Sequence, residues 1–397
     1  MDDRIERLAR LIVDFGANVQ PGQLVDVAAG IGEEELVHAV AARAYRRGAR
    51  FVDVGYFDPW LKRARVEHVA DELLEYIPPW YGERVRRLGE ARACAISLTA
   101  PTAPEVFRGL DPRRLGRDIY PRVKEWNEVL DKRTVNWCVA PSPTREWARL
   151  VYPQLELDAA YEKLWAQVIH VCRLDEEDPA AAWHARSGEI EAVAARMNGW
   201  RFDALHFEGD GTDLTVGLLP TSRWMGGGDA TVDGIDHMAN VPTEEIFSAP
   251  DPERVDGVVH ATRPLVDYAA IIDGLRVRFE GGRAVQIDAG TGAETIRALA
   301  ARDENANRLG EVALVDREGR VGKTGTVFYN TLLDENAASH VALGDAYKVC
   351  VADQDRERVN KSQLHLDFMI GSSDVAVTGI TRDGERAPVL RDGVWAL

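Results

Sequence analysis

The chain has 397 residues, of which 45% are hydrophobic and 28% are charged, and its formal net charge is −17. This length exceeds what a single hydrophobic core usually serves, so we predict two domains. The acidic charge argues against nucleic acid as a partner, because phosphates need a basic surface. The sequence also lacks the long uncharged apolar run that a membrane-crossing helix requires.

The first residues, MDDRIERLARLIVDF, are acidic and amphipathic, without the basic and apolar regions of a secretion signal. The four cysteines are scattered and form no CxxC pair, which is typical of buried thiols in a reducing compartment. We therefore expect a cytoplasmic protein with no membrane partner.

Strand and helix patterns alternate in the first part of the chain. Apolar runs predict strands at 24–29, 51–56, 93–100 and 135–140, and helical patterns lie at 33–48, 65–77 and 121–132. Pro78 and Pro79 are expected to end the second of these helices. This alternation favours an open, mostly parallel sheet with covering helices. No GxGxxG follows the first strand and no GxxxxGK[ST] occurs, so a nucleotide site is not predicted.

The character of the sequence changes after residue 173. Segment 173–185 mixes acidic residues with proline, so we predict an N-terminal α/β domain over 1–178 and a C-terminal catalytic domain over 179–397. Residues 201–219 alternate around a Gly-Asp-Gly turn, as a β-hairpin does. Further short strands are predicted at 257–266, 275–289 and 374–381. The second domain is therefore expected to be a β-rich α+β domain.

An H-x-D pair occurs in the apolar run Leu364–Phe368. Side chains alternate along a strand, so His365 and Asp367 share one face there. Two ligands that project to one point suit metal chelation. The alternative is the exposed polar face of an edge strand.

A second candidate histidine lies upstream, at His340. Asp334 can cap a helix that we predict to continue to Tyr347. His340 and Tyr347 would then be two turns apart on one side of that helix, a metal ligand beside a phenol. The alternative for His340 is a structural histidine.

Two glutamates could complete a metal site. Glu245 lies in NVPTEEIFSAPD, and Glu311 opens the apolar run EVALVD. Either could instead be a helix-cap partner or a solvated strand end. Together with His340, His365 and Asp367 they form a set of nitrogen and oxygen ligands. Five ligands are too many for one closed tetrahedral zinc but suit two divalent ions that share a bridging carboxylate.

Several longer stretches carry a family resemblance, namely NVPTEEIFSAPD, RLGEVALV, FYNTLLDENAASHVALGDAY and HLDFMIGS. Together they resemble the M29 family of metallopeptidases, the group of aminopeptidases T, S and PepS, over essentially the full chain. The resemblance implies a cytoplasmic aminopeptidase, commonly a homodimer, which removes the N-terminal residue of a peptide. It also implies two divalent metal ions, most often zinc or cobalt and sometimes magnesium.

The resemblance implies roles for individual residues. The family's metal ligands fall on Glu245, Glu311, His340, His365 and Asp367. Its catalytic tyrosine falls on Tyr347. HMANVPTEE departs from the family, which more often has an aromatic residue and a proline before the asparagine.

A general base is also needed, and Glu244 and Glu311 are its candidates. As an alternative function, a mononuclear iron(II) ring-cleaving dioxygenase of the same fold would need only His340, His365 and Asp367. A third possibility is a binding protein without catalysis. The dioxygenase would leave two of the acids without a use.

Overall fold

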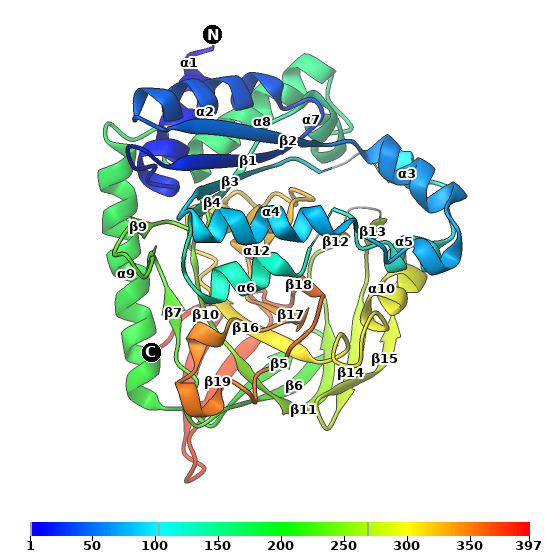
Figure 1. Ribbon diagram of the computed structural model, residues 1–397. Coiled ribbons are helices and arrows are strands. Elements are labelled where there is room, and N and C mark those ends of the chain that lie inside the picture. Colours follow the sequence, from blue (N-terminus) through cyan, green and yellow to red (C-terminus); the bar gives the residue numbers. More distant parts are fainter. Residues whose placement is uncertain (1, 102–103, 122, 268–269) are drawn as a thin grey trace. The chain divides into compact units, whose positions relative to one another are not determined.

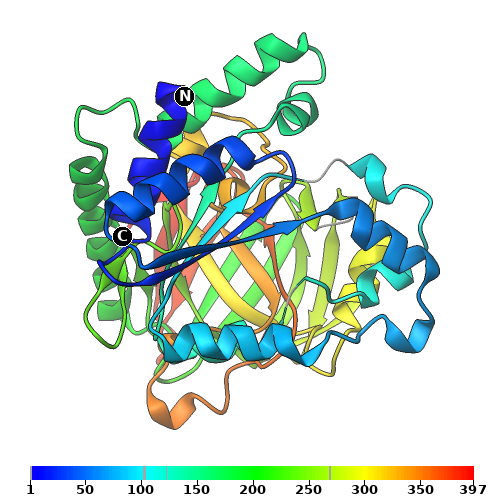
Figure 2. The same cartoon turned by 45° about the horizontal axis from the view of Figure 1, so that its top comes forward.

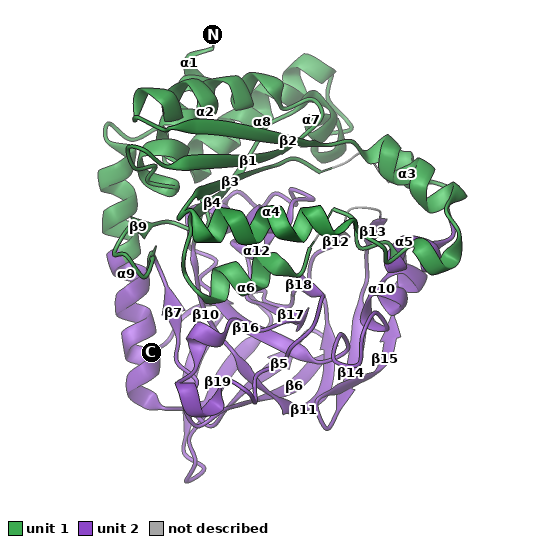
Figure 3. Ribbon diagram, in the orientation of Figure 1, with its two compact units in different colours: residues 1–110, 118–187, 228–243 green, residues 111–117, 188–227, 244–397 purple. Residues whose placement is uncertain are grey.

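The computed structural model describes residues 2–101, 104–121, 123–267 and 270–397, which form two compact units (Figure 3). Unit 1 consists of residues from 1–110, 118–187 and 228–243, and unit 2 of residues from 111–117, 188–227 and 244–397. The long helix α9 (Pro179–Trp200) begins in unit 1 and ends in unit 2. The boundary at 178/179 stays a prediction. Every helix in the described ranges is too short or too polar to span a membrane.

Unit 1 contains a four-stranded parallel sheet in the order β2-β1-β3-β4. Its strands are β1 (Leu24–Gly30), β2 (Phe51–Phe57), β3 (Cys94–Thr99) and β4 (Asn136–Pro141). Val25 and Val27 of the central strand β1 are buried. The open parallel sheet predicted for this part of the chain is confirmed.

Helices connect and flank these strands. They are α1 (Asp3–Leu11), α2 (Glu34–Arg46), α3 (Pro59–His68), α4 (Pro79–Glu90), α6 (Glu125–Asp131), α7 (Arg145–Val151) and α8 (Leu157–Val171), with shorter turns η1 (Ile12–Gly16), η2 (Asp71–Leu73) and η3 (Pro104–Phe107). Two further strands of unit 1 are short, β8 (Asp229–Ala230) and β9 (Asp236–His237). Figure 1 shows α2 alongside β1 and β2, which it contacts. All four cysteines of the chain are buried, as predicted.

The helix predicted at 65–77 is wrong in both its limits. Helix α3 begins earlier, where Asp58 accepts a hydrogen bond from the Trp60 N–H at 2.8 Å, and it ends at His68. Helix α4 then begins at Pro79, although the two prolines were predicted to end a helix. Proline fits the first helical turn because the N–H that it lacks has no partner there.

Unit 2 is built on two larger antiparallel sheets. The five-stranded sheet has the order β18-β17-β16-β10-β7, and its strands are β7 (Met225–Gly226), β10 (Glu245–Ser248), β16 (Leu309–Val315), β17 (His340–Gly344) and β18 (His365–Met369). The eight-stranded sheet contains β5 (Ala204–Gly209), β6 (Thr212–Leu218), β11 (Pro250–His260), β14 (Arg276–Glu280), β15 (Arg283–Asp288), β19 (Ala376–Ile380), β20 (Arg386–Arg391) and β21 (Val394–Trp395).

The remaining elements of unit 2 are short. They are β12 (Leu265–Asp267), β13 (Ala270–Ile272), α5 (Pro112–Arg117), α10 (Ala293–Ala300), α11 (Arg320–Lys323), α12 (Thr331–Glu335), η4 (Lys348–Cys350) and η5 (Asp353–Asp355). The predicted hairpin is confirmed: Gly209 pairs with Thr212 across a turn in which Asp210 and Gly211 have positive φ. The β-rich second half and the α/β fold class are therefore confirmed.

One apolar core joins the two sheets of unit 2. The five-stranded sheet contributes Val312, Leu314 and Val341 to it, and the eight-stranded sheet contributes Val216 and Val377. Figure 2 shows the yellow and orange strands of the smaller sheet lying across the green strands of the larger one. Since side chains alternate along a strand, the second face of the five-stranded sheet is free to carry polar residues.

Candidate metal centre

All five predicted metal ligands lie on the five-stranded sheet of unit 2. Glu245 begins β10, Glu311 lies in β16, His340 begins β17, and His365 and Asp367 lie in β18. Residues directly opposite each other on paired strands project to the same side. The register therefore decides which of these side chains can meet.

The strand pairing places four of the ligands, those on β16, β17 and β18, opposite small residues. Glu311 and Asp367 both pair with Ala342, one from each side. His340 pairs with Ala313, and His365 pairs with Gly344. The ligands therefore share the face opposite the apolar core.

The three small residues Ala313, Ala342 and Gly344 form a floor on this face. A larger side chain at any of these positions would occupy the space into which the ligands extend. At Gly344 the backbone adds a second requirement, since its φ is +104° and a Cβ would lie 2.1 Å from the carbonyl oxygen of Leu364. The sheet thus provides both the ligands and the room between them.

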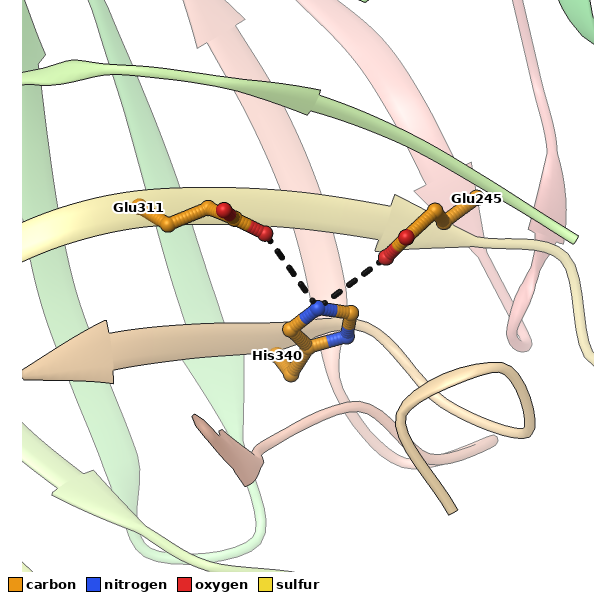
Figure 4. Close-up of side chains that lie close together, drawn as sticks. All are labelled: Glu245, Glu311 and His340. Atoms are coloured by element: carbon orange, nitrogen blue, oxygen red, sulfur yellow. Dashed lines mark ion pairs between the residues drawn. The ribbon is translucent and has the colours of Figure 1, made fainter. Parts of the chain in front are cut away.

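The side chains of Glu245, Glu311 and His340 point toward one another (Figure 4). His340 Nε2 lies 3.1 Å from Glu245 Oε2 and 3.6 Å from Glu311 Oε1. His365 Nε2 lies 3.8 Å from Glu311 Oε2 and 3.5 Å from Asp367 Oδ1. Glu311 therefore stands between the two histidines, with one carboxylate oxygen toward each.

Both histidines present the same nitrogen to the carboxylates. Nδ1 of His340 faces the carbonyl oxygen of Ala338 at 3.2 Å, and Nδ1 of His365 faces that of Asp345 at 2.9 Å. A carbonyl can only accept, so in each ring Nδ1 carries the hydrogen. Nε2 is then the nitrogen available to a metal, which is the usual arrangement of ligating histidines.

The structure adds a sixth residue, Glu335, which the sequence interpretation missed. One ligand atom each from Glu335, His340 and Asp367 lie within 4.8 Å of one another, as do atoms from Glu245, Glu311 and His340. Glu335 is buried at the end of α12. The available signal was a second acid beside Asp334 in the stretch DENAASH, where only Asp334 was given a role.

The helix predicted from Asp334 to Tyr347 is wrong. Helix α12 ends at Glu335, and His340–Gly344 is the strand β17, held between β16 and β18. Every residue of this strand is buried. Two partner strands that are distant in the sequence outweigh the helical propensity of the local alanines.

Tyr347 reaches the site from the segment that follows β17. Its ring lies 5.7 Å from the ring of His365 and 5.9 Å from that of Phe247, between centroids. Burial and the nearby charges of Glu311 and Asp367 raise the pKa of Tyr347 well above its usual value of 10. The phenol therefore keeps its proton at neutral pH and can donate a hydrogen bond.

The electrostatics of the cluster favour bound positive charge. Burial alone would lower the pKa of His340, but its contacts with Glu245 and Glu311 raise this pKa well above 6.5. Burial likewise opposes protonation of His365, whereas Asp367 and Glu311 raise its pKa to about 10. Burial raises the pKa of Glu311 as well. Without a cation, these three side chains therefore keep their protons to a higher pH than they would in water.

This donor set fits divalent cations. Imidazole nitrogens and carboxylate oxygens without thiolates suit zinc, cobalt or magnesium. A cation would supply the positive charge that protons supply otherwise, because carboxylates crowded in a buried site cannot all ionise alone. The residues present therefore fit a metal centre on chemical grounds.

Glu244 has a different position from its neighbour Glu245. Its carboxylate accepts a hydrogen bond from the Arg320 N–H at 3.3 Å, at the start of α11, and the residue is buried. This contact gives Glu244 a structural role. It leaves Glu311 as the better candidate for a general base.

A family model described as "Thermophilic metalloprotease (M29)" matches residues 1–395. The chain belongs to the M29 family. Among the M29 relatives, aminopeptidase T of Thermus aquaticus is 39% identical over 100% of this chain and 99% of its own length. Aminopeptidase T of Thermus thermophilus is 40% identical over 99% of this chain and 98% of its own length. Aminopeptidase PepS of Streptococcus thermophilus is 35% identical over 100% of this chain and 98% of its own length.

One solved structure agrees with the M29 assignment, and a second shares the fold. Wild-type AmpT from Thermus thermophilus matches with a TM-score of 0.87 at 39% identity, covering 99% of both chains. A 2,5-dihydroxypyridine dioxygenase from Pseudomonas putida KT2440 matches with a TM-score of 0.52 at 13% identity, covering 99% of this chain and 96% of the other. The second likeness shows a shared fold and nothing about the reaction.

Proposed function

We propose that this metal-dependent aminopeptidase holds two divalent cations through Glu245, Glu311, His340, His365 and Asp367. The observation that carries the proposal is the convergence of these residues on one face of the five-stranded sheet. Glu311, which has one carboxylate oxygen toward each histidine, would be a ligand shared by both ions, and this geometry supports the proposal. Glu335 is a sixth candidate ligand. Zinc or cobalt is the expected metal, with magnesium as a further option.

In peptide hydrolysis, the bound cations, Glu311 and Tyr347 would each have a separate role. Bound divalent cations supply a Lewis acid that polarises the scissile carbonyl group and makes water more acidic. Glu311 is proposed as the proton acceptor, because its carboxylate lies between the two histidines at the middle of the cluster. Tyr347 stays protonated and donates a hydrogen bond to the oxygen that gains negative charge. The substrate is a peptide with a free N-terminus.

The metal site can be tested by removing one ligand at a time. We expect His365→Ala and Asp367→Ala to lose bound metal, measured by elemental analysis, and to lose hydrolysis of leucine p-nitroanilide. His260→Ala is a matched control, because His260 lies in the eight-stranded sheet of the same unit. Variants of His365 and Asp367 with full metal content and activity would refute the proposed ligand set.

The dioxygenase alternative has only the shared fold in its favour. Iron enzymes of that type use two histidines and one carboxylate, whereas three glutamates also lie in this cluster. One iron per chain in the purified enzyme, with ring cleavage and no peptide hydrolysis, would reverse the assignment.

Two further properties stay predictions from the family resemblance, namely a homodimeric state and a cytoplasmic location. Light scattering on the purified protein tests the first, and a mass of one chain of 44.0 kDa would contradict it. Cell fractionation tests the second.

A further inference from the structure

A row of half-buried apolar side chains borders the ligand-bearing face of the five-stranded sheet. Met225 lies in β7 and Phe247 in β10, while Tyr347 and Val349 follow β17. All four pack on one small core, made of Leu219, Ala249, Ala346, Cys350, Val351 and Val359. This core is separate from the large one between the two sheets.

The strand register connects Phe247 to the metal ligands. Phe247 is two residues from Glu245 along β10, so both side chains project to one side of the sheet. Phe247 also pairs with Ala313, which pairs with His340 on its other side. Across the other edge of β10, Phe247 pairs with Met225. Met225, Phe247 and His340 therefore lie along one line across the sheet.

The rings extend this line to the catalytic groups. The Phe247 ring lies 5.9 Å from the Tyr347 ring at an angle of 60°, and the Tyr347 ring lies 5.7 Å from that of His365 at 55°. The Phe247 ring thus lies against Tyr347, the proposed oxyanion donor. On the same strand it is two residues from the proposed metal ligand Glu245.

Exposure separates this row from ordinary core residues. Phe247 is half-buried, whereas its strand neighbour Ile246, on the opposite face, is 1% exposed. On the ligand face, the positions nearest to the ligands hold Ala313 and Ala342. The half-buried Met225 and Phe247, beside these small residues, offer an apolar surface to a substrate bound at the ligands.

We propose that Met225 and Phe247 form the subsite that receives the side chain of the peptide's first residue. This inference rests on the proposed function, in which the scissile carbonyl lies between the metal ligands and Tyr347. The first side chain is only one carbon away from that carbonyl, so it must lie against a residue bordering the ligands. The chemical class that fits is a large apolar residue such as leucine, methionine or phenylalanine.

The experiment compares kcat/KM for the p-nitroanilides of leucine, phenylalanine and alanine in Phe247→Ala, Phe247→Leu and the parent enzyme. We expect Phe247→Ala to lower the leucine-to-alanine ratio at least tenfold, because it removes most of the apolar surface. Phe247→Leu should give an intermediate ratio. Metal content, measured by elemental analysis, should stay at the parent level in both variants.

A matched control is Trp200→Ala, which truncates an exposed aromatic ring stacked on Phe202 in the same unit. Its substrate ratios should equal those of the parent. Equal losses on all three substrates, or unchanged ratios in both Phe247 variants, would overturn the subsite. Failure of the parent enzyme to cleave any of the anilides would instead contradict the proposed function, so the two failures are distinguishable.

Discussion

Tyr347 is the residue whose role is most sharply defined by its surroundings. Its phenol stays protonated because burial and neighbouring carboxylates raise its pKa, so the contribution that we propose for Tyr347 is a hydrogen bond. We expect Tyr347→Phe to lower kcat by about 100- to 1,000-fold, the usual cost of one oxyanion donor. Metal content should be unchanged, since the ring remains against His365. Steady-state kinetics with elemental analysis measures both.

The control for this substitution is Tyr161→Phe, which removes a hydroxyl from α8 in unit 1. Its kcat should match that of the parent. A Tyr347→Phe variant with parental kcat would show that another group stabilises the oxyanion.

Glu33, in unit 1, is a second residue with an informative charge state. It is buried, its Oε1 accepts a hydrogen bond from the Gly30 N–H at 3.1 Å, and burial raises its pKa from 4.5 to about 8. The folded state therefore favours the protonated form. Glu33 therefore makes its full contribution to the free energy of unfolding below pH 4.5, and this contribution is lost as the pH rises to 8. The upper estimate of the loss is about 4–5 kcal/mol.

We expect Glu33→Gln to be more stable than the parent by roughly 1–3 kcal/mol at pH 9, because the amide cannot ionise and still accepts the hydrogen bond. At pH 5 the two should differ by less than about 1 kcal/mol. Urea unfolding at both values measures this, with the exposed neighbour Glu35→Gln as the control. A stability difference that is the same at both pH values would contradict the pKa argument.

At the residue scale, the sequence predicted some site members for sound physical reasons and missed others. The H-x-D spacing depends only on the alternation of a strand, and β18 is indeed a strand. Glu335 could not be assigned from the sequence, because its one local signal, a position beside Asp334, does not show which residues it meets in space. Only the fold brings it to His340 and Asp367.

Among the elements, the join between β10 and α12 can be tested directly. Asn336 is fully buried, and its Oδ1 accepts the Glu244 N–H at 2.6 Å while its Nδ2 donates to the carbonyl oxygen of Leu332 at 2.8 Å. This side chain thus ties the start of β10, with Glu245, to the end of α12, with Glu335. We regard Asn336 as a positioning residue.

We expect Asn336→Ala to cost about 2–3 kcal/mol of stability, because two buried backbone groups lose their partner. Metal affinity should fall roughly 10- to 100-fold, as for other residues that orient ligands. Asn198→Ala is the control, since Asn198 makes the same two-way contact with the backbone of Trp224. It should lose stability while keeping the parental metal affinity, measured by titration of the metal-free enzyme. Equal metal affinity in the two variants would argue against positioning.

The pairing of strands explains why the helix predicted from Asp334 to Tyr347 is wrong. Local alanines in AASHVALGDAY favour a helix, and nothing nearby in the sequence indicates the strand partners of His340–Gly344. Those partners begin at Leu309 and His365. Pairing over such separations is a property of the sheet as a whole, which single-sequence periodicity cannot report.

For the whole molecule, removal of the metal provides the broadest test. A ligand that binds only the folded chain stabilises it by about 2.7 kcal/mol at a hundred times its Kd. We therefore expect a chelator to lower Tm by about 3 °C and added zinc or cobalt to restore it, measured by calorimetry. An unchanged Tm after verified metal loss would mean that the cluster does not depend on cations for its stability.

The fold class was within reach of the sequence. The repeated strand–helix spacing indicated the parallel sheet, and the change to two-residue alternation indicated the β-rich half. The order of the strands could not be predicted from the sequence, because β16 pairs with both β10 and β17, and β10 lies far upstream. Local patterns therefore indicated the five candidate ligands one by one, and the motif resemblance then implied their roles as one ligand set.

The floor of Ala313, Ala342 and Gly344 implies an unusual pattern of mutational tolerance. None of the three has a group that can react, ionise or bind a metal, yet each faces a proposed ligand across a strand. In a comprehensive substitution screen, these positions should reject residues in proportion to side-chain volume, with polar serine accepted at Ala313 and Ala342 more readily than apolar leucine. Loss of function there would report on the room that the ligand side chains need, and a search for reactive side chains would not detect it.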